Sequence, residues 1–241
     1  MNGNKYLVGL IGLALGFIVG YFATQSMNKN AGGATGGSGS TGPQSSAGGQ
    51  QTQQGMMANV QATIEKARNS PTDYQAQIDV ARVYNQIGRA DETVEYLLKA
   101  YEIDPVETGK LGAFPFVGQW YFEKKNYDQA EVWFRRALEV DSSEPDVYVI
   151  LAEALNLRTP PEPDKAIKEL ELALKINPTN SHALVHLLDA YLLKKDARLA
   201  DETLNRLTAA EPTNLKIASY QTAIADLKAG RPVTLPKERP E

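Results

Sequence analysis

The stretch that decides the fold is residues 181–214, SHALVHLLDAYLLKKDARLADETLNRLTAAEPTN. Apolar residues recur at helical spacing in both of its halves, as Leu184, Leu187, Leu188 and Tyr191 and then as Ala200, Leu204 and Leu207. The polar run Lys194-Lys195-Asp196 interrupts the pattern between them. The stretch therefore predicts two amphipathic helices joined by a turn, and it ends in the same Pro-Thr-Asn that precedes it, as one unit of a repeat would.

The same period of 34 residues extends through most of the chain. It predicts four helix pairs, at residues 74–107, 111–144, 145–180 and 181–214. Single amphipathic helices at 56–70 and 215–229 are expected to cap the two ends, because the outer faces of terminal repeats need cover. A Pro-rich tail follows at 230–241, and the run Thr159 to Pro163 predicts a rigid, non-helical turn inside the third unit.

The N-terminus has a different character. Residues 6–24, YLVGLIGLALGFIVGYFAT, carry no charge, and a helix of that length spans about 28 Å, enough for a bilayer core. A cleaved signal peptide is the alternative, but the apolar run is long for one and lacks a good cleavage site. With residues 1–5 on the cytoplasmic side, as Lys5 and the terminal amine favour, the bulk of the chain faces outward. In a bacterium with two membranes this predicts an inner-membrane protein with a periplasmic domain.

Glycines at four-residue intervals, Gly12, Gly16 and Gly20, line one face of the predicted span. Such a face permits close approach of two helices, so a homo-oligomer is one hypothesis, although glycine is common in membrane spans without it. Residues 25–55 are rich in Gly, Ser and Gln and predict a flexible, disordered linker.

Charge and composition exclude several classes of protein. All 29 acidic residues follow Gly55, and residues 56–241 carry a net charge of −6 with their basic pairs scattered. Nucleic acid is therefore not an expected partner. The chain has no cysteine, which excludes disulfides and thiolate chemistry without identifying a compartment.

The repeated pattern of apolar, small and aromatic residues resembles the tetratricopeptide repeat. Gln77, Thr93, Ser142 and Leu207 depart from that pattern. The resemblance implies an all-α fold, a right-handed α-solenoid of helix pairs, whose concave face is lined by the first helix of each pair and receives peptides or partner helices. The positions that it assigns to this face are Ile78, Arg82, Asn85, Phe116, Gln119, Phe122, Val149, Glu153, Asn156, His186 and Asp189.

The lining so assigned is mixed, with apolar patches. It lacks the Lys and Asn set with which some members of the family hold a terminal carboxylate, so an amphipathic helix or an extended segment is the expected ligand. The alternative for Phe116, Val149 and similar residues is that they pack inside the stack.

A membrane span, a linker and these repeats together also resemble bacterial proteins of cytochrome c maturation, which present apocytochrome for haem ligation. Residues 64–89, IEKARNSPTDYQAQIDVARVYNQIGR, are similar to the start of the repeat region in those proteins. The likeness is confined to that region, and it implies apocytochrome binding as an alternative function.

Chemistry at a catalytic or metal centre is not indicated. His182, His186 and Asp189 share one helix face, but a two-His set with one carboxylate is a weak metal site, so no metal is expected. Nucleotide-binding, zinc-protease and hydrolase motifs are absent, and no nucleophile is paired with a base. We therefore expect no enzyme and no cofactor. The sequence predicts a membrane-anchored scaffold that binds a protein partner, with a self-assembling structural subunit as a further alternative.

Overall fold

The computed structural model describes residues 47–236, and these fold into α-helices without any strand. The all-α class is thus confirmed for this part of the chain. No helix within residues 47–236 is long and apolar enough to span a bilayer. The predicted span at 6–24, its glycines Gly12, Gly16 and Gly20, and the predicted linker up to residue 46 lie outside the described residues.

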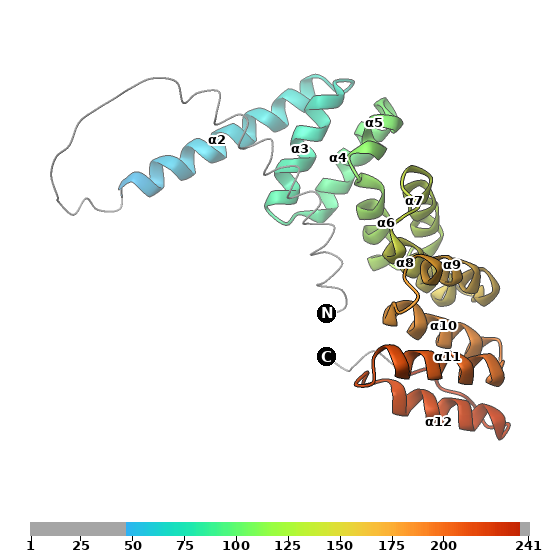
Figure 1. Cartoon of the computed structure of the whole chain (residues 1–241). Helices are drawn as coiled ribbons and strands as arrows, with labels where there is room; N and C mark the ends of the chain where they lie inside the picture. The colour runs from blue at the N-terminus through green and yellow to red at the C-terminus, as the bar shows by residue number, and fades with distance from the viewer. Residues whose placement is uncertain (1–46, 237–241) are drawn as a thin grey trace. The chain divides into compact units, whose positions relative to one another are not determined.

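The chain divides into two compact units after Gly112. The described part of the first unit contains α2 (Ala47–Asn69), α3 (Tyr74–Gln86), α4 (Ala90–Ile103) and α5 (Pro105–Lys110). The second contains α6 (Ala113–Glu123), α7 (Tyr127–Val140), α8 (Pro145–Leu157), α9 (Pro163–Ile176), α10 (Ser181–Leu193), α11 (Ala197–Ala210) and α12 (Ile217–Lys228). Each of the four predicted repeats holds one consecutive pair of long helices, and Figure 1 shows them in chain order from cyan to red.

Helix α2 begins at Ala47, nine residues before the capping helix expected at 56–70. Residues 47–55 are therefore helical and do not belong to the flexible linker expected for 25–55. The glutamines of this stretch are good helix formers, whereas Gly48, Gly49 and Gly55 disfavour a helix by about 1 kcal/mol each, so propensity alone does not account for the extension.

Gln77 explains one departure from the repeat pattern. Its side chain is 1% exposed, and its amide donates to the carbonyl oxygens of Ala67 and Ser70, each at 3.2 Å. These carbonyls lie at the C-terminal end of α2, where the helix offers them no partner. A polar residue replaces the usual aromatic because it caps the helix that packs beside it.

The residues between the first and second repeats form a helix of their own. Asp104 accepts hydrogen bonds from the backbone N–H groups of Val106 and Glu107 at 3.1 and 3.0 Å, and Pro105 occupies the first helical position. Both are helix-start signals, and they account for α5, a helix that the repeat pattern did not predict.

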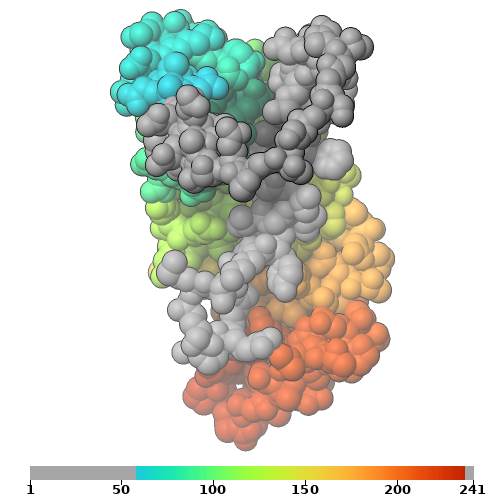
Figure 2. Space-filling view, turned by 90° about the vertical axis from the view of Figure 1, so that its left-hand side faces the viewer, coloured from blue at the N-terminus to red at the C-terminus, as the bar shows by residue number. Residues whose placement is uncertain are grey.

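In the second unit each helix packs against the next along the chain, and the first helices α8, α10 and α12 also contact one another in order. Small residues are fully buried where the helices of a pair cross: Ala130, Ala166 and Ala200 are 0% exposed. In the space-filling view of Figure 2, the orange and red residues of the fourth repeat and α12 form one block. The last helix thus covers α10 and α11, as a capping helix should.

The turns inside the repeats share one backbone conformation. Gly88, Lys125 and Lys195 occupy the same place after the first helix, with φ values of 74°, 59° and 60°. This left-handed conformation reverses the chain tightly and favours glycine. The third repeat uses a longer turn, in which the N–H of Glu162 donates to the carbonyl of Leu155 at 2.9 Å. Pro163, expected within the non-helical run, instead begins α9 at a position that tolerates its missing N–H.

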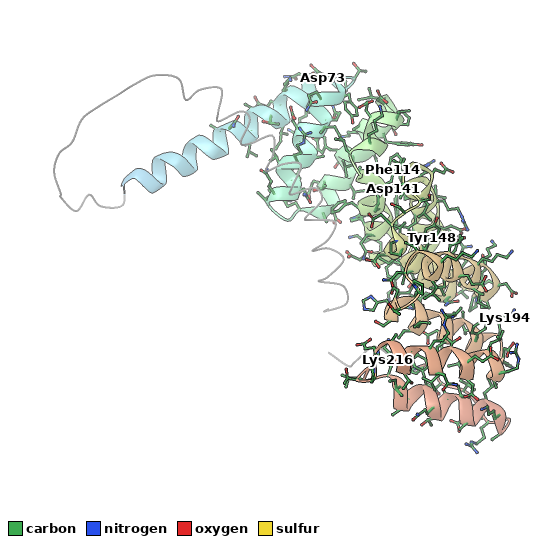
Figure 3. All side chains as sticks on the ribbon, in the orientation of Figure 1. Asp73, Phe114, Asp141, Tyr148, Lys194 and Lys216 are labelled. Atoms are coloured by element: carbon green, nitrogen blue, oxygen red, sulfur yellow. The ribbon has the colours of Figure 1, made fainter. Side chains whose placement is uncertain are left out.

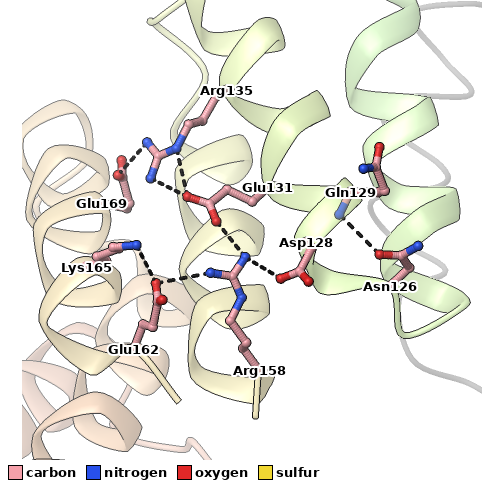
Figure 4. A network of polar contacts seen from close by, with 9 residues as sticks. All are labelled: Asn126, Asp128, Gln129, Glu131, Arg135, Arg158, Glu162, Lys165 and Glu169. Carbon is pink, nitrogen blue, oxygen red and sulfur yellow. Dashed lines mark hydrogen bonds and ion pairs between the residues drawn. The ribbon is translucent and has the colours of Figure 1, made fainter. Parts of the chain in front are cut away.

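An ion-pair network joins α7, the end of α8 and α9 (Figure 4). Arg158 lies between Asp128, Glu131 and Glu162, with N–O distances of 2.8, 2.7 and 3.2 Å. Arg135 connects Glu131 to Glu169 at 2.8 and 3.0 Å. Burial raises the pKa of Glu131, but the hydrogen bonds from Arg135 and Arg158 more than offset this, and its net pKa is lowered. The network holds consecutive repeats in register through bonds that each need a defined geometry.

Candidate functional site

The first-helix face of the second unit, which is the surface formed by α6, α8, α10 and α12, carries eight of the eleven residues assigned to a groove. Three of the eleven have almost no exposed surface: Ile78, Val149 and Gln119 are 2%, 4% and 6% exposed. For Val149 the structure favours the alternative, packing inside the stack, and Ile78 also packs inside its unit. Phe116 is half-buried.

Arg82 and Asn85 lie in the first unit, and both are half-buried on α3. The Arg82 guanidinium pairs with Asp79, one turn earlier on the same helix, at 3.1 Å. These two residues belong to the first unit and are described with it.

An aromatic pair begins the line of side chains on the first-helix face. The rings of Phe122, at the end of α6, and Tyr127, at the start of α7, meet edge to face at 5.5 Å between centroids. Both are half-buried. Burial raises the pKa of Tyr127, and the Glu153 carboxylate on α8 raises it further. The Glu153 carboxylate thus acts electrostatically on one member of the aromatic pair.

A polar cluster continues the line across α8 and α10. The Nε2 atom of His186 lies 3.7 Å from a carboxylate oxygen of Glu153, and its Nδ1 lies 3.8 Å from one of Asp189. Asn156 donates its amide to the backbone carbonyl of His186 at 3.4 Å. The structure thus brings together Glu153, Asn156, His186 and Asp189, which the sequence placed on one face without their contacts.

Asp189 also binds the capping helix. The hydroxyl of Tyr220, which is 0% exposed on α12, donates to Oδ1 of Asp189 at 2.8 Å. Burial raises the pKa of Asp189, while His186, the Tyr220 hydrogen bond and Lys216 lower it and Glu153 raises it; the net direction is upward. Figure 3 labels Lys216 directly before α12 and Lys194 directly after α10. Asp189 therefore contacts both His186 in the polar cluster and Tyr220 on the capping helix.

Two carboxamide oxygens on this face are buried and accept no hydrogen bond from the described part of the chain: Oδ1 of Asn156 and Oε1 of Gln119. Their amide nitrogens are used, since Gln119 donates to Glu123 at 3.1 Å and Asn156 donates to His186. In both side chains, the atom without a hydrogen bond is thus the carbonyl oxygen, which is an acceptor.

Sequence reasoning missed Tyr127, Tyr220 and Lys216. Tyr127 opens a second helix and Tyr220 lies in the capping helix, whereas the repeat pattern assigns the surface to the first helix of each pair. Which residue the Tyr220 hydroxyl reaches depends on how α12 docks, which no local pattern gives. Within residues 47–236 no group of three His, Asp or Glu is placed to hold a metal, and His182 is exposed.

Comparisons with known proteins agree with the fold. Residues 162–227 match one profile described as tetratricopeptide repeat, and residues 74–107 and 116–144 match another with the same description. Together these ranges make up more than half of the chain.

Solved structures of similar fold include the crystal structure of MamA, with 21% identity and a TM-score of 0.52 over 74% of this chain and 100% of that chain. A tetratricopeptide repeat protein from Parabacteroides merdae has 14% identity and a TM-score of 0.56, over 65% of this chain and 60% of its own. MamA from Desulfovibrio magneticus, from residue 41 onward, has 16% identity and a TM-score of 0.51, over 65% and 85%. At these identities the likeness concerns the fold alone.

Proposed function

The chain belongs to the tetratricopeptide repeat family, and from this premise we propose that it is a membrane-anchored scaffold that binds a protein partner through its first-helix face. Repeats of this kind typically serve as protein-interaction modules. The observations that carry the proposal are the half-buried aromatic pair Phe122 and Tyr127 and the half-buried polar cluster of Glu153, His186 and Asp189 in the same unit. Such a mixture of apolar contact and directed polar groups suits a peptide or helix.

The anchoring part of the proposal rests on the sequence. An uncharged run of 19 residues at 6–24 is long enough to span a bilayer, and Lys5 before it favours a cytoplasmic start. The repeats would then lie in the periplasm of a bacterium with an inner membrane. Residues 25–46, taken as flexible coil, would hold α2 about 25 Å from the bilayer, close enough to restrict the partner to the membrane vicinity.

Site-specific photo-crosslinking in intact membranes tests the binding surface. A photoreactive residue replaces Phe122 on the proposed face, and the control carries it at Leu172, which is 39% exposed on the second helix α9. We expect a discrete adduct with another protein from position 122 and none from position 172. Equal labelling at the two positions, or no adduct at position 122, would contradict the proposed surface. Mass spectrometry of the adduct identifies the partner.

The identity of the adduct also separates the alternative functions. An apocytochrome would make the protein an assembly factor of cytochrome c maturation. A second copy of this chain as the sole product would make it a self-assembling subunit and would direct attention to Gly12, Gly16 and Gly20.

A further inference from the structure

We propose that the second unit binds the surface of an anionic lipid bilayer along one edge. This edge, called the basic edge, is formed by the turns at the C-terminal ends of α6, α8, α10 and α12, at residues 123–128, 157–165, 193–198 and 226–231. The inference rests on the membrane anchoring in the proposed function and adds a second contact with the membrane. Lys125 and Lys195 would lie at the lipid phosphates, and Leu157 would lie among the headgroups.

Ion pairs show that these four turns lie side by side. Each pair joins a basic residue at the end of a first helix to an acidic residue in the second helix of the preceding repeat: Arg158 with Asp128, Lys194 with Asp164, and Lys228 with Asp201. Figure 4 shows the first of these pairs. The pairs connect the turns in one row, so the basic residues of successive repeats gather along a single edge.

The basic edge carries more positive than negative charge. Its four turns contain nine basic and six acidic residues. The turns between repeats, at residues 139–146, 175–182 and 209–216, form the opposite edge and contain two basic and five acidic residues. Figure 3 shows Lys194 on the basic edge and Lys216 on the opposite one. The unit is thus polarised, although the repeat region as a whole is acidic, and an anionic surface attracts one edge and repels the other.

Two lysines of the basic edge have no partner in the described part of the chain. Within residues 47–236 the side chains of Lys125 and Lys195 form no ion pair and no hydrogen bond, and both are exposed. Their neighbours differ, since Lys124 lies over an aromatic ring and Lys194 belongs to one of the ion pairs above. Each Lys-Lys turn therefore holds one lysine against the protein and leaves the other available to an outside anion.

The backbone conformation at these two lysines favours glycine over any other residue. Lys125 and Lys195 have φ values of 59° and 60°, in the left-handed region where a Cβ is crowded. The turns at Gly88 and Gly230 use the same hydrogen-bond pattern with glycine, at 74° and 68°. The geometry of the turn thus does not account for lysine at either position, whereas a function of the positive charge accounts for both.

The third repeat adds an exposed apolar side chain to the edge. Leu157, the last residue of α8, is 49% exposed, and Pro160 and Pro161 after it are exposed as well. Basic residues around exposed apolar groups are typical of protein surfaces that lie in the headgroup region of a bilayer. Because the lysines are spread over separate turns, they match a continuous charged surface better than a single acidic group on a protein.

Lipid-attached quenchers test the contact, with the full chain reconstituted into vesicles. The chain has no cysteine, so one introduced cysteine carries a fluorescent label at one position. The label replaces Thr159 on the basic edge or, as the matched control, Thr213 on the opposite edge; both threonines are exposed. With about 30% phosphatidylglycerol in phosphatidylcholine, headgroup nitroxides should quench position 159 about threefold more than position 213. In phosphatidylcholine alone, the two positions should be quenched equally.

The double variant Lys125→Gly with Lys195→Gly tests the two unpaired charges. Glycine suits the left-handed backbone, so the variant keeps the fold while it loses two positive charges. Quenching at position 159 should fall to its level in phosphatidylcholine. The control, Lys175→Ala with Arg206→Ala, removes two exposed charges outside the basic edge and should leave the quenching unchanged. Salt raised from about 50 to about 500 mM should act like the glycine variant, because it screens these charges.

Equal quenching of positions 159 and 213 in the anionic vesicles, or equal effects of the two double variants, would overturn the inference. So would a preference for position 159 that persists in phosphatidylcholine alone. If a photoreactive residue at position 159 captures a protein in intact membranes and the vesicles show no quenching, the edge binds an acidic protein and the inference is wrong. Extraction of the chain from the vesicles by alkaline carbonate would contradict the anchor alone, since the quenching reports the edge whether or not residues 6–24 span the bilayer.

Discussion

Gly118 sets the distance between α6 and α7 in the second repeat. A Cβ placed on it would lie 2.8 Å from both Cδ1 and Cε1 of the Phe134 ring, nearer than real carbon atoms approach. Phe134 is 1% exposed, so its ring has little room to move. At this position the absence of a side chain is a packing requirement.

Gly118→Ala should therefore destabilise the protein by about 1 to 3 kcal/mol, since the ring or the helix must shift. Helix propensity alone predicts the opposite, a gain of about 0.5 to 1 kcal/mol. The sign of the change in the free energy of unfolding, from urea denaturation, decides between the two. Ser219→Ala, exposed in α12, is the control and should stay within about 0.5 kcal/mol. An increase in stability for Gly118→Ala would show that the close approach is absent.

The folded protein disfavours the ionised form of Asp189, because burial raises the pKa of this carboxyl group above its value in the unfolded chain. Its contribution to stability is thus fully present below the unfolded value, about 3.9, and is lost as pH rises through the folded value. Asp189→Asn removes this titration and keeps an oxygen that can accept the Tyr220 hydroxyl.

Relative to the wild type, Asp189→Asn should gain stability as pH rises from about 4 to 7. The measurement is the difference in unfolding free energy between the two proteins across that range. Taking the difference cancels the opposite trend from carboxylates such as Glu131 and Glu162, whose pKa values are lowered. A difference that is flat with pH, or that falls, would contradict the raised pKa.

At the scale of elements, the last helix shows how a polar bond complements apolar packing. Tyr220 and Ile224 bury one face of α12, at 0% and 2% exposure. The Tyr220 hydroxyl then donates its one hydrogen to Oδ1 of Asp189 at 2.8 Å, and the carbonyl oxygen of Val185 lies 3.3 Å from the same hydroxyl. The ion pair of Lys228 with Asp201 is exposed and adds little. The buried face and the hydroxyl together determine where α12 docks.

Tyr220→Phe should cost about 1 to 3 kcal/mol, because it leaves buried acceptors without their donor. Amide hydrogen exchange in α12 should become faster before it does in α8. Tyr148→Phe is the matched control, since the Tyr148 hydroxyl makes no hydrogen bond within residues 47–236 and should tolerate removal. Equal effects of the two substitutions would show that the hydroxyl of Tyr220 does not hold the helix.

At the scale of the whole molecule, the unit that begins at Ala113 contains three complete repeats and a capping helix. Its helices contact their neighbours along the chain, and the stability of such an array is roughly a sum of nearest-neighbour terms. The candidate site lies wholly within this unit.

A fragment of residues 113–236 should therefore fold alone. Circular dichroism measures its helicity and its thermal unfolding. The fragment 113–214, which lacks α12, serves as the comparison and should lose stability because it exposes the apolar faces of α10 and α11. A fragment 113–236 without cooperative unfolding, or equal stability of the two fragments, would contradict this prediction.

Much of this architecture could be predicted from the sequence. The 34-residue period, helical spacing and small residues at the crossings are local signals, and they led to the four helix pairs and to the tetratricopeptide repeat. The resemblance to the tetratricopeptide repeat, in turn, placed Glu153, His186 and Asp189 on one face. Local signals misassigned residues 47–55, where a composition rich in Gly and Gln indicated coil and the structure has the first turns of α2.

By itself, the sequence determined the repeat, because helical periodicity and turn chemistry act over a few residues. Only the tertiary structure decided that Val149 and Ile78 are core, that His186 lies between Glu153 and Asp189, and that Tyr220 reaches Asp189 from a different helix. Contacts of this kind depend on the angle and distance at which successive helices pack, to within about an ångström, and no local pattern encodes these.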